Sequence, residues 1–96
     1  MFEIEATYLF LEQVDRLSSQ AKRILDRKIV LLKDNPYRNK RIIYAGLFLF
    51  RLRLESQRQE KRVIYLVTGK TVKMLCILDR KNDYTDLEQY LARLGY

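Results

Sequence analysis

The chain has 96 residues, of which 48% are hydrophobic, and it carries 19 basic and 12 acidic side chains for a net charge of +7. This length fits one domain with one modest core, so residues 1–96 are expected to form a single domain. Histidine is absent, which excludes histidine-ligated metals and histidine acid–base chemistry, and no apolar run approaches the ~20 residues that span a bilayer.

Two further features bear on location. The first residues do not show the basic-then-apolar pattern of a secretion signal. The single cysteine, Cys76, has no partner for an internal disulfide, which suits a reducing compartment. A cytoplasmic protein with no membrane contact is therefore expected.

The first third of the chain predicts one strand and two helices. Residues 2–6 alternate between apolar and polar side chains, as a short strand does. Thr7 is placed to cap a helix, and Ser18 or Ser19 to end it or to cap a second. The second helix ends before Pro36, because the residue preceding a proline is pushed out of the α region. The two helices are expected to form an antiparallel hairpin.

The stretch from Phe48 to Leu54 alternates strictly and predicts the second strand. Its even-numbered positions are all apolar and fall on one face. Leu49, Arg51 and Arg53 fall on the other face, with the two guanidinium groups spaced roughly 7 Å apart along the strand. The apolar face is expected to form the core, and the opposite face to display the two cations.

The segments around this strand are less uniform. Residues 37–46 indicate no clear element, although Gly46 marks a turn into the strand. Residues 55–60 are polar and predict a flexible connection. Strands are expected over residues 61–68 and 71–78, joined by a tight hairpin at Gly69.

The end of the chain predicts a buried strand, a polar loop and a helix. Both alternating sets of the strand over residues 71–78 are mostly apolar, so it is expected to be central and covered on both faces, with Cys76 buried. Thr85 and Glu88 match a capping box, which starts the last helix at about Asp86 and runs it to Leu94.

These elements predict an α+β fold in the order β-α-α-β-β-β-α. The sheet is mainly antiparallel, and the helical hairpin covers the apolar side of the strand at residues 48–54, giving two layers. The opposite side is expected to be partly open and to carry Arg51 and Arg53.

The positive charge is concentrated in the predicted sheet. Residues 37–81 carry twelve basic and three acidic side chains, whereas the first 36 residues are balanced. Such a surface suits a nucleic acid or an acidic protein, and the alternative is an ordinary solvated basic surface.

Three motifs in this order resemble the RelE/ParE superfamily of toxins from type II toxin–antitoxin pairs. They are the strand Phe50–Leu54, the strand Lys61–Tyr65 after a polar connection, and the loop Asp79–Tyr84 after an apolar strand. The resemblance covers essentially the whole chain. Its RelE branch implies a cytoplasmic mRNA interferase: a ribosome-dependent endoribonuclease that inhibits translation, in which a 2′-hydroxyl attacks the adjacent phosphate and leaves a cyclic phosphate.

The resemblance also implies roles for particular residues. Cations would hold the phosphate and stabilise the charge of the transition state, and a tyrosine would stack on a base. These roles fall on Arg51, Arg53, Arg62, Arg80 or Lys81, and Tyr84. Arginine is a poor general base, so the base remains open among Tyr84, Lys81, Asp79, Asp83 and no group of the isolated protein.

Other interpretations of the same residues remain open. Arg62 could form a cross-strand ion pair with Glu55 or Glu60, and Tyr84 could pack against the last helix. The ParE branch implies a non-enzymatic inhibitor of DNA gyrase, and a degenerate member would bind only RNA or its antitoxin. The expected partners are a cognate antitoxin, the ribosome and mRNA; no cofactor or metal is expected.

Overall fold

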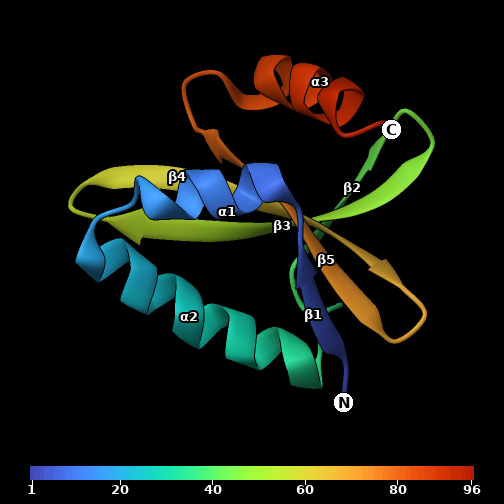
Figure 1. Ribbon diagram of the computed structural model, residues 1–96, viewed down its shortest axis with the longest axis horizontal. Coiled ribbons are helices and arrows are strands. Elements are labelled where there is room, and N and C mark those ends of the chain that lie inside the picture. Colours follow the sequence, from blue (N-terminus) through green and yellow to red (C-terminus); the bar gives the residue numbers. More distant parts are fainter.

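The computed structural model describes the backbone of residues 1–96 and every side chain except those of Asp83 and Tyr84. The elements along this described backbone are β1 (Glu3–Ala6), α1 (Tyr8–Asp15), α2 (Ser19–Asp34), β2 (Lys40–Tyr44), β3 (Leu47–Ser56), β4 (Gln59–Thr68), β5 (Thr71–Asp79) and α3 (Asp83–Arg93). The strands form one five-stranded sheet in the order β1-β5-β4-β3-β2. Only the β1–β5 pair is parallel within it, so the predicted α+β fold with a mainly antiparallel sheet is confirmed (Figure 1).

Both predicted helix starts are confirmed by side-chain caps. The Thr7 hydroxyl accepts a hydrogen bond from the Phe10 amide at 3.0 Å, and Ser18 accepts one from the Ala21 amide at 3.1 Å. Each cap satisfies one of the amides that the first turn of a helix leaves without a partner. Helix α2 then ends at Asp34, two residues before Pro36, as the proline predicts.

Helix α1 lies along the same edge of β5 that pairs with β1. β1 pairs with residues 71–74 of β5, and beyond it α1 supplies the remaining hydrogen bonds. The Thr7 hydroxyl donates to the Leu75 carbonyl at 2.7 Å, and the Gln13 amide both donates to the Ile77 carbonyl (2.8 Å) and accepts from its amide (2.6 Å). The backbone of β5 is therefore satisfied along this edge, as buried peptide groups require.

One strand was not predicted from the sequence. β2 forms from residues 40–44 and pairs antiparallel with β3 through a two-residue turn at Ala45 and Gly46. Both turn residues have positive φ, +52° and +78°, which is the conformation that a tight hairpin requires. The predicted turn at Gly46 is confirmed, and it joins two strands.

The prediction of a flexible connection between β3 and β4 was wrong. β3 continues to Ser56 and β4 begins at Gln59, so only Gln57 and Arg58 form the turn. Both have positive φ, +52° and +65°, a conformation that is costly for residues with a Cβ atom. The turn lacks the glycine or asparagine that usually marks such a hairpin, which explains why its sequence resembles a loop.

The sheet has a core on each face. On one face, buried side chains of α1 and α2 pack on Phe50, Leu52 and Leu54, as predicted. On the other face, α3 packs through Leu87 and Leu91. Figure 1 shows α3 set apart from the α1–α2 hairpin. The second face is therefore covered in part, and its uncovered part carries the predicted cations.

The last helix begins earlier than predicted. It starts at Asp83, and its N-cap residue Asn82 makes no side-chain capping bond. Thr85 lies inside the first turn, so the predicted capping box was wrong. β5 has neighbours on both sides and buried residues on both faces, and Cys76 is fully buried, as predicted. None of the helices described is long and apolar enough to cross a membrane.

Candidate functional site

The predicted strand cations lie on the same face of the sheet and meet across the β3–β4 pair. Arg53 stands directly opposite Arg62, and Arg51 stands opposite Ile64. Directly opposed side chains have Cβ atoms about 4.5–5.5 Å apart, and like charges in that position are destabilising. The fold therefore holds two guanidinium groups together against their mutual repulsion.

A carboxylate at the end of β4 offsets this repulsion. Glu60 Oε1 lies 3.5 Å from Arg53 Nε, while Glu60 Oε2 lies 3.8 Å from Arg62 Nε and 3.9 Å from Arg80 Nε. The Glu60 side chain is only 13% exposed. The alternative that Arg62 pairs with Glu60 is thus confirmed, but in the same contact Glu60 brings together three of the predicted site residues.

Backbone geometry places Arg80 at this centre. The Arg80 amide donates to the Glu60 carbonyl at 3.4 Å, immediately after Asp79 ends β5. The loop that follows β5 therefore stays beside the end of β4. Arg80 is largely exposed (70%), so it is in contact with solvent as well as with Glu60.

The surface around Glu60 is hollowed. A depression of about 540 Å³ is lined by Arg58, Glu60, Arg80 and Lys81, among others. A second depression, of about 430 Å³, is lined by Glu55 and again by Arg58, Glu60 and Arg80. Both of the cations that were alternatives for the loop position, Arg80 and Lys81, therefore face one hollow.

Arg51 lies further along β3. It is half-buried and stands opposite Lys40 of β2, which forms a second like-charged pair on the same face. Among the side chains that the structure describes, no acid lies within ion-pair distance of Arg51. Unlike Arg53, Arg62 and Arg80, it is not bound to Glu60.

Of the remaining candidate residues, one is engaged in an ion pair and two have side chains that are not described. Asp79, one candidate base, pairs with Lys61 at 2.6 Å on the face that carries the helical hairpin. The side chains of Tyr84 and Asp83 lie outside the described residues. Asp79 nevertheless lines the depression of about 540 Å³ together with Glu60, Arg80 and Lys81, so it lies near the loop cations. The base therefore stays open.

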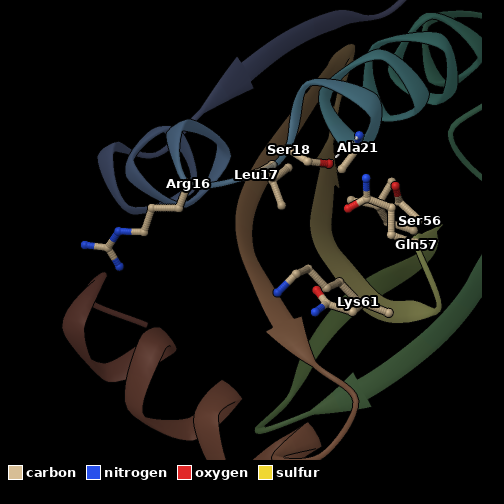
Figure 2. A pocket seen from close by; sticks show the side chains of 9 residues that line it. Arg16, Leu17, Ser18, Ala21, Ser56, Gln57 and Lys61 are labelled. Carbon is tan, nitrogen blue, oxygen red and sulfur yellow. Dashed lines mark hydrogen bonds between the residues drawn. The ribbon is translucent and has the colours of Figure 1, made fainter.

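A smaller cavity of about 130 Å³ lies on the helix-hairpin side, where the α1–α2 junction meets the β3–β4 turn. Figure 2 shows Ser18 and Ala21 on one side of it, with Ser56, Gln57 and Lys61 on the other. The Ser56 hydroxyl is buried without a hydrogen-bond partner among the described atoms. The predicted phosphate-binding residues do not line this cavity.

Three groups that could take part in proton transfer have structural environments. Burial raises the pKa of Tyr65, whose hydroxyl donates to the Pro36 carbonyl at 2.6 Å. Burial also raises the pKa of Cys76 to about 12 and that of Tyr90, the latter with help from Asp86. All three favour the protonated form at neutral pH. For Cys76 this agrees with the buried position predicted from the sequence.

The arginine-rich end of this sheet can now be compared with known proteins. In solved structures, the fold is similar to a double arginine-to-alanine mutant of Escherichia coli toxin RelE in the free state (TM-score 0.76, 15% identity, 99% of this chain and 98% of that chain). The isolated E. coli RelE toxin gives a TM-score of 0.70 at 16% identity over 98% and 99% of the two chains.

The chain has the RelE fold. A third structure, the intact E. coli RelBE toxin–antitoxin complex, matches with a TM-score of 0.70 at 19% identity, over 82% of this chain and 96% of that chain. No protein-family model matches the sequence. No curated protein sequence matches it either. The likeness to RelE is therefore one of fold, and it spans nearly the whole of both chains.

Sequence reasoning missed two residues of this charged surface. Glu60 was considered only as an ion-pair partner of Arg62, and Lys40 was assigned to no element. Glu60 and Arg62 are two positions apart in the chain, so their side chains fall on the same face of a strand. This spacing could have indicated that Glu60 belongs to the site. The approach of Arg53 and Arg80 depends on the register of three strands, which the sequence does not show.

Proposed function

We propose that this protein is the toxin of a toxin–antitoxin pair and that it cleaves mRNA on the ribosome. The observation that carries the proposal is the cluster of Arg53, Arg62 and Arg80 around Glu60, with Arg51 beside it, on the partly open face of a RelE fold. A solvated surface does not require two arginines in direct cross-strand register, because the pairing is unfavourable.

The cluster suits a reaction at a phosphodiester. The 2′-hydroxyl of the message attacks the adjacent phosphorus, the bond to the 5′-oxygen breaks, and the products are a 2′,3′-cyclic phosphate and a 5′-hydroxyl. The proton lost from the 2′-hydroxyl goes to a base, and the leaving oxygen gains one. Arginines bind phosphate oxygens in a bidentate manner and stabilise the charge that develops on them.

The roles of the individual cations follow from their surroundings. Arg53, Arg62 and Arg80 share the Glu60 carboxylate, and Arg53 also contacts Glu55. Three guanidinium groups gathered beside these acids attract a phosphate to the cluster. Arg51 has no described acid as a partner and would give its whole guanidinium to the phosphate. Lys81 and Arg58, on the lip of the hollow, would bind neighbouring phosphates. Tyr84 is proposed to stack on a base.

The test is cleavage of messages on translating ribosomes by the purified protein, with mapping of the new ends. The variant Arg51→Ala/Arg53→Ala/Arg62→Ala should lose about 100-fold or more in rate. The matched control, Lys22→Ala/Arg23→Ala/Arg27→Ala on α2, removes the same charge and should cleave normally. Intact messages with the unaltered protein, or equal loss in both variants, would refute the proposal.

A toxin of this kind requires an antitoxin partner. One of the structural neighbours is a RelE toxin bound to its antitoxin, which supports the same arrangement here. We propose an antitoxin with an acidic segment that covers Arg51 and Arg53 in the cytoplasm. Co-purification from the native operon tests this, and recovery of the protein alone would contradict it.

A second function is favoured by one observation. Arginine does not readily accept a proton, and Asp79, one of the candidate bases, is paired with Lys61. A ParE-like inhibitor of DNA gyrase, or a member that only binds RNA or its antitoxin, would need no base. Inhibition of supercoiling without cleavage of messages would favour the gyrase inhibitor, and binding without either activity would favour the last.

A further inference from the structure

The contacts of Glu60 are unusual in their number and in their geometry. One carboxylate contacts three arginines that come from β3, β4 and the end of β5. All three contacts are made through Nε, at 3.5, 3.8 and 3.9 Å. At its other end, the Arg53 guanidinium has a second acidic neighbour, because Arg53 Nη1 lies 3.5 Å from Glu55 Oε1.

This geometry matters because a guanidinium has two edges. Arginine presents five N–H donors in a rigid fork, and only one of them is the Nε–H. A carboxylate beside Nε attracts that edge of the fork and so favours orientations in which the Nη groups point away from it. Three such contacts on one anchor would orient three forks relative to one another.

We propose that Glu60 is a positioning residue that holds Arg53, Arg62 and Arg80 as a preformed phosphate-binding cluster. The inference rests on the proposed function, which it deepens by assigning a role to the acid within the cluster. Glu60 does not touch the reacting atoms in this scheme. It acts by reducing the freedom of side chains that would otherwise have to be ordered when the phosphate binds.

Two properties of Glu60 support the role. Its side chain is 13% exposed, whereas those of Arg53 and Arg80 are 66% and 70% exposed. Glu60 is therefore more enclosed by its surroundings than these two arginines. Glu60 also lies beside the tight Gln57–Arg58 turn, which fixes the end of β4. An exposed acid on a mobile loop would not restrain three arginines.

Glu55 provides a matched control. It stands directly opposite Glu60 across the β3–β4 pair, on the same face. It contacts Arg53 Nη1 at 3.5 Å, and its side chain is 59% exposed. The substitutions Glu60→Gln and Glu55→Gln thus remove the same charge at neighbouring positions. Only the first removes the shared anchor.

The first experiment follows the arginine Nε–Hε signals by NMR spectroscopy in the purified protein. In Glu60→Gln, the signals of Arg53, Arg62 and Arg80 should shift and broaden together, while that of Arg51 stays in place. In Glu55→Gln, only Arg53 should change. Unchanged Arg62 and Arg80 signals in Glu60→Gln, with an intact amide spectrum, would overturn the proposal.

The second experiment measures the affinity for a short single-stranded RNA. Whether the substitution of Glu60 raises this affinity decides between two roles for the carboxylate. If Glu60 only neutralised charge, its removal would strengthen binding to a polyanion. If it positions the arginines, Glu60→Gln should bind no tighter than the wild type, and cleavage should slow by about tenfold or more. Glu60→Asp keeps the charge but withdraws the carboxylate, so it should also slow cleavage. Tighter RNA binding by Glu60→Gln than by Glu55→Gln would overturn the proposal, as would a wild type that binds no RNA.

The proposed function can fail separately. If the wild-type protein binds RNA but cleaves no message on ribosomes, the nuclease assignment is wrong. The NMR and binding comparisons of Glu60→Gln with Glu55→Gln then still decide whether Glu60 positions the cluster.

Discussion

The two faces of β3 differ although their residues alternate along the same ten positions. On the face that the helical hairpin covers, Phe50, Leu52 and Leu54 are all buried. The opposite face is divided: Leu49 is fully buried in the core that α3 helps to form, whereas Arg53 is exposed. On the first face, three successive positions are buried under the helical hairpin. The second face contributes to a core only where α3 covers it.

Neighbouring residues of β3 therefore have different roles: those on one face stabilise the fold, and those on the other belong to the candidate site. Because side chains alternate across a strand, Leu52 can hold the core while its neighbours face the opposite way. The arginines are then fixed by a backbone whose other side is close-packed. Substitutions on the two faces should accordingly change different measurements.

The largest effect is expected from Leu52→Ala. Leu52 is 5% exposed and packs beneath the helical hairpin, so its truncation should lower the free energy of unfolding by about 2–5 kcal/mol. The neighbouring substitution Arg53→Ala should change it by only about 0.5 kcal/mol. Urea unfolding of both variants measures this. An equal loss in the free energy of unfolding would show that Arg53 stabilises the fold as much as Leu52 does, and that the two faces do not differ in this respect.

The next effect concerns a buried hydroxyl on the hairpin side. Tyr65 is fully buried and stacked on Phe50. Its hydroxyl donates to the Pro36 carbonyl and accepts from the side-chain amide of Asn39. Tyr65→Phe leaves both groups without this partner and should lower the free energy of unfolding by about 1–3 kcal/mol. RNA binding by the folded protein should not change.

The control for this substitution is Tyr37→Phe. Tyr37 also belongs to the aromatic contacts of this face, but it is 56% exposed. Removing its hydroxyl deletes the same atom from a site that water can reach. A loss as large as that of Tyr65→Phe would mean that the buried hydrogen bonds are not the cause.

The covered part of the other face should show its own pH dependence. Burial raises the pKa of Cys76 from 9.0 to about 12, so the unfolded thiol ionises at lower pH than the folded one. The resulting stability is complete below pH 9 and is lost as the pH rises toward 12. By pH 10 the loss should be about 1.4 kcal/mol.

Urea unfolding between pH 8 and pH 10 measures this loss. Cys76→Ala should be less stable throughout, but it should lack this part of the pH dependence, because it has no thiol to ionise. Lysines, and tyrosines other than Tyr90, whose raised pKa depends in part on Cys76, contribute equally to both proteins. Parallel curves for the two would refute the assignment to Cys76.

The sequence predicted the elements whose signals are local. The alternation of residues 48–54 predicted both faces of β3, and Thr7 and Pro36 predicted helix ends, because each acts through its own backbone or its near neighbours. β2 was missed because its residues, Lys-Arg-Ile-Ile-Tyr, do not alternate. It is stable as a strand because β3 pairs with it, which is a tertiary effect.

The types of residue in the candidate site could be predicted from the sequence, but the central position of Glu60 could not. The basic residues could be found from the alternation and from a family resemblance. That Glu60 lies among Arg53, Arg62 and Arg80 depends on the registers β3–β4 and β4–β5 and on the backbone bond from Arg80 to Glu60. A register shift of one residue would have put Glu60 on the other face.

The smallest effect is expected at the turn beside the charged face. Gln57 and Arg58 both adopt positive φ, which costs about 1–2 kcal/mol for each residue with a Cβ atom. Arg58→Gly relieves this strain but adds freedom to the unfolded chain, so the free energy of unfolding should rise by about 0.5–1 kcal/mol. Arg58→Ala removes the same charge and keeps the strain, so it should not be more stable. If alanine stabilised the protein as much as glycine does, the gain would come from loss of a cation beside Arg80 and Lys81. Repulsion between the cations of this face, and not strain in the backbone of the turn, would then be the destabilising factor.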